Sequence, residues 1–255
     1  MKHFYTGILL CLQFFSALPI KRELPLTNQN VTAMYAIMPL LSLLTGAATI
    51  GFLQLNQHWL HLSPLVVAII LTIVMIAVTG GIHTDGFIDT SDAFFSYRDQ
   101  EKRLTILDDP RVGAFGVLAV VSLLLLKIAF LYEALLREVD MLYFIAVPLL
   151  ARLAMLLYFM TMNSAKTTGL AAYFKERVQQ RTVGIACAIY SMLVIGYALY
   201  TGEWSLLILY SVALLGVLYY RHWSKKNFAG MTGDLLGALY EGMELLLWGT
   251  LLLFI

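Results

Sequence analysis

Residues 112–135, VGAFGVLAVVSLLLLKIAFLYEAL, form an almost uninterrupted apolar run. A helix needs about 20 such residues to cross the hydrocarbon core of a bilayer, which is about 30 Å thick. Similar runs recur along the chain of 255 residues, which is 60% hydrophobic and 13% charged, with a mean hydropathy of +0.79. Because a soluble domain usually carries about 25% charged residues, the sequence predicts an all-α, polytopic membrane protein.

Turn or polar residues separate seven of these runs, and we expect about seven transmembrane helices. Several runs are short for a full crossing, so their boundaries are approximate. No repeat or change in composition divides the chain, which predicts one integral membrane domain over residues 1–255. The predicted spans are residues 33–53, 64–79, 112–135, 141–162, 182–200, 204–220 and 235–255.

The N-terminal apolar stretch, residues 4–18, differs from these spans. Lys2 followed by apolar residues is typical of a signal peptide, but Gln13 interrupts the stretch and no small-residue cleavage site follows it. Pro19 then ends the stretch abruptly. We therefore predict a retained interfacial or re-entrant segment.

Lys and Arg residues are distributed unequally between alternate loops. The loops at 20–32, 81–111, 163–181 and 221–233 contain two, four, four and three of them, whereas those at 54–63, 136–140 and 201–203 contain none, one and none. The positive-inside rule assigns the basic loops to the cytoplasm, which predicts a multi-pass protein of a bacterial or archaeal cytoplasmic (inner) membrane, in contact with lipid. The net charge of +1 gives no sign of a nucleic-acid partner, and a homo-oligomer stays open.

One of the basic loops also holds an unusual group of acids, in the stretch 80–92, GGIHTDGFIDTSD. Asp85, Asp89 and Asp92 are spaced i, i+4, i+7, which places them within about 60° of one another on one face of a helix. Three carboxylates on one stripe repel each other unless a cation lies among them. Oxygen ligands favour Mg²⁺, Mn²⁺ or Ca²⁺ over softer metals.

A second acidic group begins the last apolar run. Asp234 and Glu241 share a helical face at i, i+7, and Glu244 follows close by. A central acid costs about 2.5 to 3.5 kcal/mol to insert in a bilayer, so such residues usually face a polar interior and find partners there. The orientation puts both groups on one side of the membrane, where they could share a cation. Alternatively, Asp234 caps a helix and the glutamates lie at an interface.

Four other residues are candidates for contacts with an anionic substrate. Asp109 and Arg111 belong to an acidic turn before a helix whose N-terminus, around Gly113, can offer backbone N–H groups to an anion. Arg111 can form a fork with phosphate, or it can simply belong to the positive-inside pattern. Arg152 lies inside an apolar run and needs an acid or a phosphate as its partner.

His83 precedes the first aspartate of the cluster by two residues. A lone histidine is often only a hydrogen-bond partner, but this one adjoins several carboxylates. It can orient a carboxylate, contact phosphate or accept a proton, since its unperturbed pKa is near 6.5. Together, the acids, the bases and the glycine-started helix suit chemistry on a diphosphate.

Three segments resemble the cobalamin synthase (adenosylcobinamide-GDP ribazoletransferase) family, and the likeness covers nearly the whole chain. The resemblance implies that α-ribazole or its 5′-phosphate attacks adenosylcobinamide-GDP with a ribose hydroxyl, giving adenosylcobalamin or its 5′-phosphate and GMP, with Mg²⁺ required. Thr84, Ile88, Ala93 and residues 229–231 depart from the usual family pattern without removing a carboxylate. The matching segments are residues 79–92 (TGGIHTDGFIDTSD), 109–116 (DPRVGAFG) and 232–241 (TGDLLGALYE).

The resemblance implies the following roles for the candidate residues. Arg111 and Arg152 would neutralise phosphate, in a substrate site that includes Asp109 and Gly113. His83, or one of the carboxylates, would accept the hydroxyl proton. Five residues would hold Mg²⁺ or support its ligands: Asp85, Asp89, Asp92, Asp234 and Glu241.

Two other functions remain as alternatives. A CDP-alcohol phosphotransferase also uses an Asp-Gly motif with spaced aspartates, but its longer pattern, Asp-x-x-Asp-Gly-x-x-Ala-Arg, is absent. A cation-coupled transporter also carries acids within the membrane, but it often has inverted repeats and places its acids near the midplane. Here the acids gather at one side.

Overall fold

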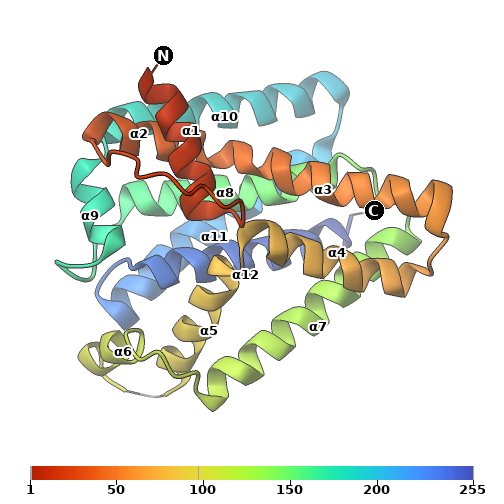
Figure 1. Ribbon diagram of the computed structural model, residues 1–255. Coiled ribbons are helices and arrows are strands. Elements are labelled where there is room, and N and C mark those ends of the chain that lie inside the picture. The colour runs from red at the N-terminus through yellow and green to blue at the C-terminus, as the bar shows by residue number, and fades with distance from the viewer. Residues whose placement is uncertain (1, 97, 255) are drawn as a thin grey trace.

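The structure is a computed structural model that describes residues 2–96 and 98–254 (Figure 1). Its described residues form helices and no strand, with one isolated bridge between Ser164 and Met231. The all-α prediction is therefore confirmed. In chain order the elements are α1 (Lys2–Phe15), α2 (Asn28–Ile37), η1 (Met38–Leu40), α3 (Leu41–Leu55), η2 (Asn56–Leu60), α4 (Pro64–Thr79), α5 (Ile82–Phe95), α6 (Gln100–Ile106), α7 (Ala114–Leu136), α8 (Tyr143–Thr161), α9 (Leu170–Arg177), α10 (Gln180–Thr201), α11 (Trp204–Phe228) and α12 (Gly233–Leu251).

Five helical stretches of the described chain are long and apolar enough to cross a membrane: Asn28–Leu60, α7, α8, α10 and α11. A sixth is obtained if α4 and α5 count as one broken span. The polytopic class is confirmed, but the expected number of about seven spans is higher than the structure gives. The difference arises at two places: α4 counts as a span only together with α5 across their bend, and α12 carries three acids and is enclosed by other helices. Ile255, where the seventh predicted span ends, lies outside the described residues.

Helices α8 and α12 form the core of the bundle. Most side chains of both helices are buried, and α12 packs against α5, α7, α8 and α11. In Figure 1, α10 runs along one edge of the molecule and α7 along the opposite edge. These outer helices expose large apolar side chains, such as Leu118 and Leu125 on α7 and Met192 and Leu193 on α10. A continuous apolar exterior of this kind suits contact with lipid.

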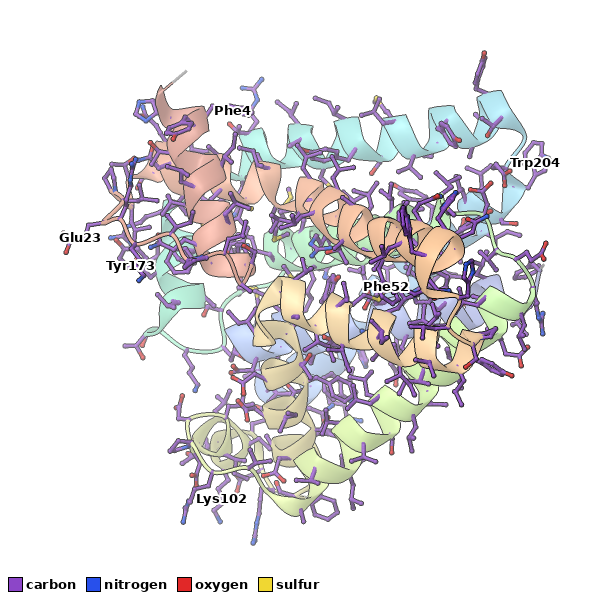
Figure 2. The ribbon with its side chains drawn as sticks, turned by 45° about the vertical axis from the view of Figure 1, so that its right-hand side comes forward. Phe4, Glu23, Phe52, Lys102, Tyr173 and Trp204 are labelled. Atoms are coloured by element: carbon purple, nitrogen blue, oxygen red, sulfur yellow. The ribbon has the colours of Figure 1, made fainter. Side chains whose placement is uncertain are left out.

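The four basic loops gather at one end of the bundle. Figure 2 places Glu23, Lys102 and Tyr173, from three of them, on one side of the molecule, with Trp204 at the far end. Three polar contacts join neighbouring basic loops. They are the ion pair between Lys166 Nζ and Asp108 Oδ1 (2.7 Å), the hydrogen bond from Arg103 Nη1 to Asn227 Oδ1 (2.6 Å) and the hydrogen bond from Gln179 N to Thr32 Oγ1 (2.9 Å).

The loops that are poor in Lys and Arg meet at the opposite end. The Tyr143 hydroxyl donates to Glu203 Oε2 over 3.0 Å, which links the start of α8 to the α10–α11 turn. Gln54 Nε2 donates to Met141 Sδ over 3.3 Å, which links the end of α3 to the α7–α8 turn. The loops that are rich in Lys and Arg and the loops that are poor in them therefore lie at opposite ends of the helix bundle.

A sharp bend between α4 and α5 places the acidic helix. The two helices are related by an angle of 95°. Gly80 and Gly81 form the bend with φ values of 67° and 74°, which side chains with a Cβ rarely adopt. The bend turns α5 away from the line of α4 and against α12.

The N-terminal stretch predicted as interfacial or re-entrant forms the single helix α1, which packs against α2. Its 14 residues are fewer than the about 20 needed to cross a bilayer. Leu10 and Cys11 are buried against the bundle, whereas Phe4 and Tyr5 are exposed. The interfacial position of this helix stays a prediction.

Candidate active site

The two acidic helices, α5 and α12, touch through glycine. A Cβ on Gly86 would lie 2.8 Å from the Asp234 Cα, and a Cβ on Gly237 would lie 3.0 Å from the His83 Cα. Distances of about 3 Å or less to backbone leave no room for a side chain. The glycines therefore let the backbones of α5 and α12 approach closely.

This approach brings the aspartates of both helices together. Asp89 lies within electrostatic range of Asp85, Asp92 and Asp234. Asp85 is exposed, and the other three are partly buried. In the described part of the chain, no three His, Cys, Asp or Glu side chains are already arranged to hold a metal ion. The donor set nevertheless fits Mg²⁺, because it is made only of carboxylate oxygens whose charges repel.

Asp92 has a contact that the other aspartates lack. Its Oδ1 accepts a hydrogen bond of 3.3 Å from the Gly116 N–H, in the first turn of α7. A Cβ on Gly113, the N-cap of α7, would collide with the same carboxylate. The helix N-terminus expected to receive substrate phosphate is thus already in contact with Asp92, as helix dipoles favour.

The segment before α12 is fixed against the loop that follows α8. Ala165 N donates to Met231 O, and Met231 N donates to Asn163 O, both over 2.9 Å. Gly230 permits this pairing, because a Cβ there would lie 2.7 Å from Asn163 O. Thr232 then caps α12 by accepting from Leu235 N over 3.2 Å. The pairing holds both segments at one side of a cavity.

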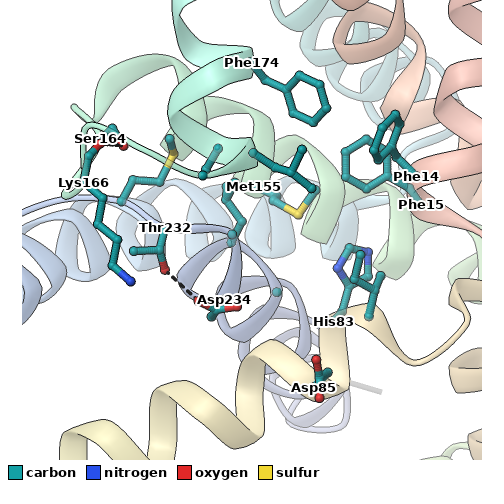
Figure 3. A pocket seen from close by; sticks show the side chains of 18 of the residues that line it. Phe14, Phe15, His83, Asp85, Met155, Ser164, Lys166, Phe174, Thr232 and Asp234 are labelled. Atoms are coloured by element: carbon teal, nitrogen blue, oxygen red, sulfur yellow. Dashed lines mark hydrogen bonds between the residues drawn. The ribbon is translucent and has the colours of Figure 1, made fainter. Parts of the chain in front are cut away.

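Lys166, in the paired loop, is a site residue that sequence reasoning missed. Its Nζ lies 2.7 Å from Asp108 Oδ1, and it lines the same cavity as Asp234. In the sequence it was only one of four bases in its loop, so its position near Asp234 (Figure 3) depends on tertiary structure.

A cavity of about 320 Å³ lies between α1, α5, α9 and α12 (Figure 3). Asp85, Asp108, Lys166 and Asp234 line its polar side. His83 lines it as well, and Figure 3 shows it between Asp85 and aromatic side chains. The opposite side, which we call the aromatic wall, consists of Phe14, Phe15, Tyr35, Met155 and Phe174.

Glu241 does not point to the aspartates. Its Oε2 lies 2.7 Å from Lys127 Nζ, and its Oε1 accepts a 2.8 Å hydrogen bond from the Thr84 hydroxyl. Glu244 Oε2 lies 2.6 Å from the same ammonium, and all three charged side chains are buried. Both oxygens of Glu241 are therefore engaged, which argues against the expected role of this residue as a metal ligand.

The two arginines proposed as phosphate partners do not line the cavity. Arg111 is 86% exposed and forms a two-bond fork with Asp109 at 2.9 and 2.7 Å. This guanidinium lowers the pKa of Asp109 to about 2. Arg152 is buried: its guanidinium lies 4.9 Å from the centre of the Tyr240 ring and donates to Thr45 Oγ1 over 3.3 Å.

His83 is held by aromatic rings on both sides. Its ring centre lies 6.5 Å from that of Phe15 and 4.4 Å from that of Tyr240. The side chain is 3% exposed, and its Nε2 has no hydrogen-bond partner among the described residues. Its surroundings are therefore mainly aromatic rather than carboxylate.

The close approach of α5 and α12 predicts a selective effect of alanine. Gly86→Ala should lower stability by about 1–3 kcal/mol, because the new methyl group would push against the Asp234 backbone. Gly242→Ala on α12 is the control, since a Cβ there meets nothing within 4 Å, and it should be neutral or stabilising by up to about 1 kcal/mol. Thermal unfolding in detergent measures both. Equal midpoints would contradict the packing.

The bundle and its site define a class: a multi-pass α-helical membrane protein with a carboxylate-lined cavity at its basic end. The chain belongs to the family described as Cobalamin-5-phosphate synthase, whose model matches residues 7–252.

Relatives of nearly equal length agree. An adenosylcobinamide-GDP ribazoletransferase of Geobacillus kaustophilus (strain HTA426) is 40% identical, with 98% of this chain and 97% of the relative covered. Proteins of the same name from Geobacillus thermodenitrificans (strain NG80-2) and Clostridium botulinum (strain 657 / Type Ba4) are 37% and 30% identical, covering 98% and 94% of this chain and 96% and 95% of the relatives. No solved structure matches the chain.

Proposed function

We propose that this protein is a transferase that joins α-ribazole, or its 5′-phosphate, to the adenosylcobinamide phosphate group of adenosylcobinamide-GDP. A ribose hydroxyl forms a bond to the phosphorus next to the cobinamide, the bond from that phosphorus to the bridging oxygen breaks, and GMP leaves. The names of the full-length relatives support this reaction. The observation that carries it in the structure is the meeting of Asp85, Asp89 and Asp234 beside Lys166.

The aspartate cluster is the proposed binding site for Mg²⁺. Asp85, Asp89 and Asp234 would hold the ion, with Asp92 contributing the oxygen that α7 does not engage. Bound there, Mg²⁺ would neutralise phosphoryl oxygens and stabilise the departing GMP. Glu241 is left out of the ligand set because Lys127 and Thr84 engage its oxygens.

Two residues of the chain would bind the diphosphate and accept the hydroxyl proton. Lys166 lines the same polar side of the cavity as Asp234 (Figure 3), where its ammonium would pair with the diphosphate. Asp85 is the most exposed of the clustered carboxylates and is our candidate for accepting the hydroxyl proton, through the oxygen that would not bind the ion. We assign this step to a carboxylate rather than His83 because the histidine is packed between aromatic rings.

We further propose that the protein spans the cytoplasmic (inner) membrane of a bacterium or archaeon, with the basic end of the bundle on the cytoplasmic side. The positive-inside rule supports this orientation, since the four Lys- and Arg-rich loops meet at that end. Both polar substrates would then enter from the cytoplasm, and the apolar faces of α7 and α10 would contact lipid.

GMP release from adenosylcobinamide-GDP by the purified protein tests the proposed reaction. The assay is run with α-ribazole and with its 5′-phosphate, each with Mg²⁺ and with a chelator. GMP should appear only with a nucleophile and Mg²⁺ together. Metal flux into proteoliposomes without GMP release would instead favour a transporter.

Lys166→Met tests the proposed phosphate contact. The loss of its charge should lower kcat/KM for adenosylcobinamide-GDP by about a hundredfold, while Lys166→Arg should keep most of the activity. Lys102→Met is the matched control, because Lys102 is an exposed base on α6 at the same end. Equal kcat/KM values for Lys166→Met, Lys102→Met and the unchanged protein would remove Lys166 from the site.

A further inference from the structure

The aromatic wall has no part in the proposed transfer of the phosphate group. Its members come from four helices: Phe14 and Phe15 from α1, Tyr35 from α2, Met155 from α8 and Phe174 from α9. They contact each other: the ring centre of Phe174 lies 5.1 Å from that of Phe14 and 6.0 Å from that of Tyr35. Figure 3 shows this wall on the far side of His83 from Asp85. The cavity therefore has an apolar, ring-lined end joined to an acidic end.

On the basis of the proposed function, we infer that the aromatic wall and His83 bind the base of the α-ribazole nucleophile. The flat base lies against Phe14, Phe174 and Met155, and a ring N–H of His83 donates to its unsubstituted ring nitrogen. The ribose then extends toward Asp85 and Asp234. The wall thus selects the nucleophile, and the carboxylates act on its hydroxyl.

The size of the cavity suits a nucleoside. At about 320 Å³ it lies at the lower end of the range of ligand pockets, about 300–1,000 Å³. A bicyclic base with its ribose fits such a volume, whereas the corrin macrocycle with its side chains is far larger. The corrinoid must therefore lie outside this cavity, with only its diphosphate reaching the carboxylates.

The polarity of the wall distinguishes a benzimidazole from guanine, the base of the nucleotide that leaves as GMP. The benzimidazole of α-ribazole has one free acceptor nitrogen and no donor, so it needs one hydrogen bond. His83 is the lining side chain with a ring nitrogen that lacks a partner among the described residues. Guanine carries several donors and acceptors, which the apolar members of the wall would leave unpaired at a cost in affinity.

Steady-state kinetics of Phe174→Ala and Met155→Ala test the wall. Loss of base contact should raise KM for α-ribazole about tenfold and leave KM for adenosylcobinamide-GDP unchanged. Phe4→Ala is the control, because Phe4 lies on α1 but is exposed and does not line the cavity. A rise in KM for adenosylcobinamide-GDP alone, or no change in either KM, would overturn the inference. The proposed reaction would still stand in that case if the unchanged protein releases GMP.

A binding measurement without turnover tests the part of His83. Purified protein in detergent and chelator is titrated with α-ribazole and with its indole analogue, in which carbon replaces the acceptor nitrogen. The unchanged protein should bind α-ribazole about tenfold more tightly than the analogue. His83→Leu should lose this preference, and His83→Gln, which keeps a donor, should retain part of it.

Equal preferences in the unchanged protein and in His83→Leu would overturn the hydrogen bond. Binding of guanosine in place of α-ribazole would overturn the assignment of the wall to the nucleophile. Failure of the proposed reaction has a different signature, which is α-ribazole binding without GMP release.

Discussion

Asp89→Asn is expected to lower the rate of GMP release by about 10²–10³-fold. Asp89 is the aspartate in electrostatic range of all three others, Asp85, Asp92 and Asp234. An amide keeps the shape of the side chain but removes the charge that would hold a divalent ion. The assay is single-turnover GMP formation over a range of Mg²⁺ concentrations, so that a loss through weaker metal affinity is separated from a loss that persists at saturation.

Glu101→Gln is the matched control for this variant. Glu101 belongs to the same acidic stretch of the sequence but lies exposed on α6, and its neutralisation should leave the rate unchanged. Glu101→Gln should unfold at the same temperature as the unchanged protein, and Asp89→Asn at the same or a higher temperature without Mg²⁺, because it removes one of several repelling charges. Undiminished turnover by Asp89→Asn would contradict the role of the aspartate cluster in the reaction.

Lys127→Met is expected to cause the largest loss of stability, about 3–5 kcal/mol. The substitution leaves Glu241 and Glu244 without the ammonium that lies 2.7 and 2.6 Å from their oxygens. Two buried carboxylates would then repel each other with no counter-charge between them. Thermal unfolding in detergent should show a fall in Tm on the order of 10 °C.

The triple variant Lys127→Met, Glu241→Gln, Glu244→Gln is the control for this prediction. It removes the charges together, so it should recover most of the lost Tm, because an apolar or neutral replacement of a whole buried ion group is often tolerated. A triple variant that is no more stable than Lys127→Met would mean that packing of the lysine stem, rather than charge, is responsible.

The parts of the site that the sequence predicts correctly depend on short-range spacing and on the charges of the loops. The i, i+4, i+7 pattern put Asp85, Asp89 and Asp92 on one helical face, and the alternation of basic loops put Asp234 at the same end. Both inferences need only helical geometry and the topology of the chain. The meeting of α5 and α12 follows from them together with the glycines between the helices.

The residues that the sequence assigned differently depend on contacts between distant segments. Glu241 was expected near a metal because local spacing does not reveal its partner. That partner, Lys127, lies 114 positions away in the chain. The guanidinium of Arg111 is a suitable phosphate ligand, but it pairs with the neighbouring Asp109 in solvent. Lys166 and the aromatic wall were missed because no periodic pattern connects them.

The number of spans was too high for a related reason. Apolar runs report the composition of a segment and not the direction of its helix. Residues 64–79 are apolar enough for a span, but Gly80 and Gly81 bend the chain by 95° into α5. The last run is enclosed by other helices, so its hydrophobicity reflects protein packing as well as lipid.

The central claim is that α5 and α12 hold one divalent ion between them, and Mn²⁺ binding followed by electron paramagnetic resonance tests it most directly. The unchanged protein, Asp89→Asn and Asp234→Asn are titrated with Mn²⁺ in detergent without substrate, with Glu101→Gln as the control. The account predicts that each aspartate variant, one on each helix, loses the same tight binding event, which Mg²⁺ displaces in the unchanged protein. Tight binding that survives in either variant would contradict a shared ion.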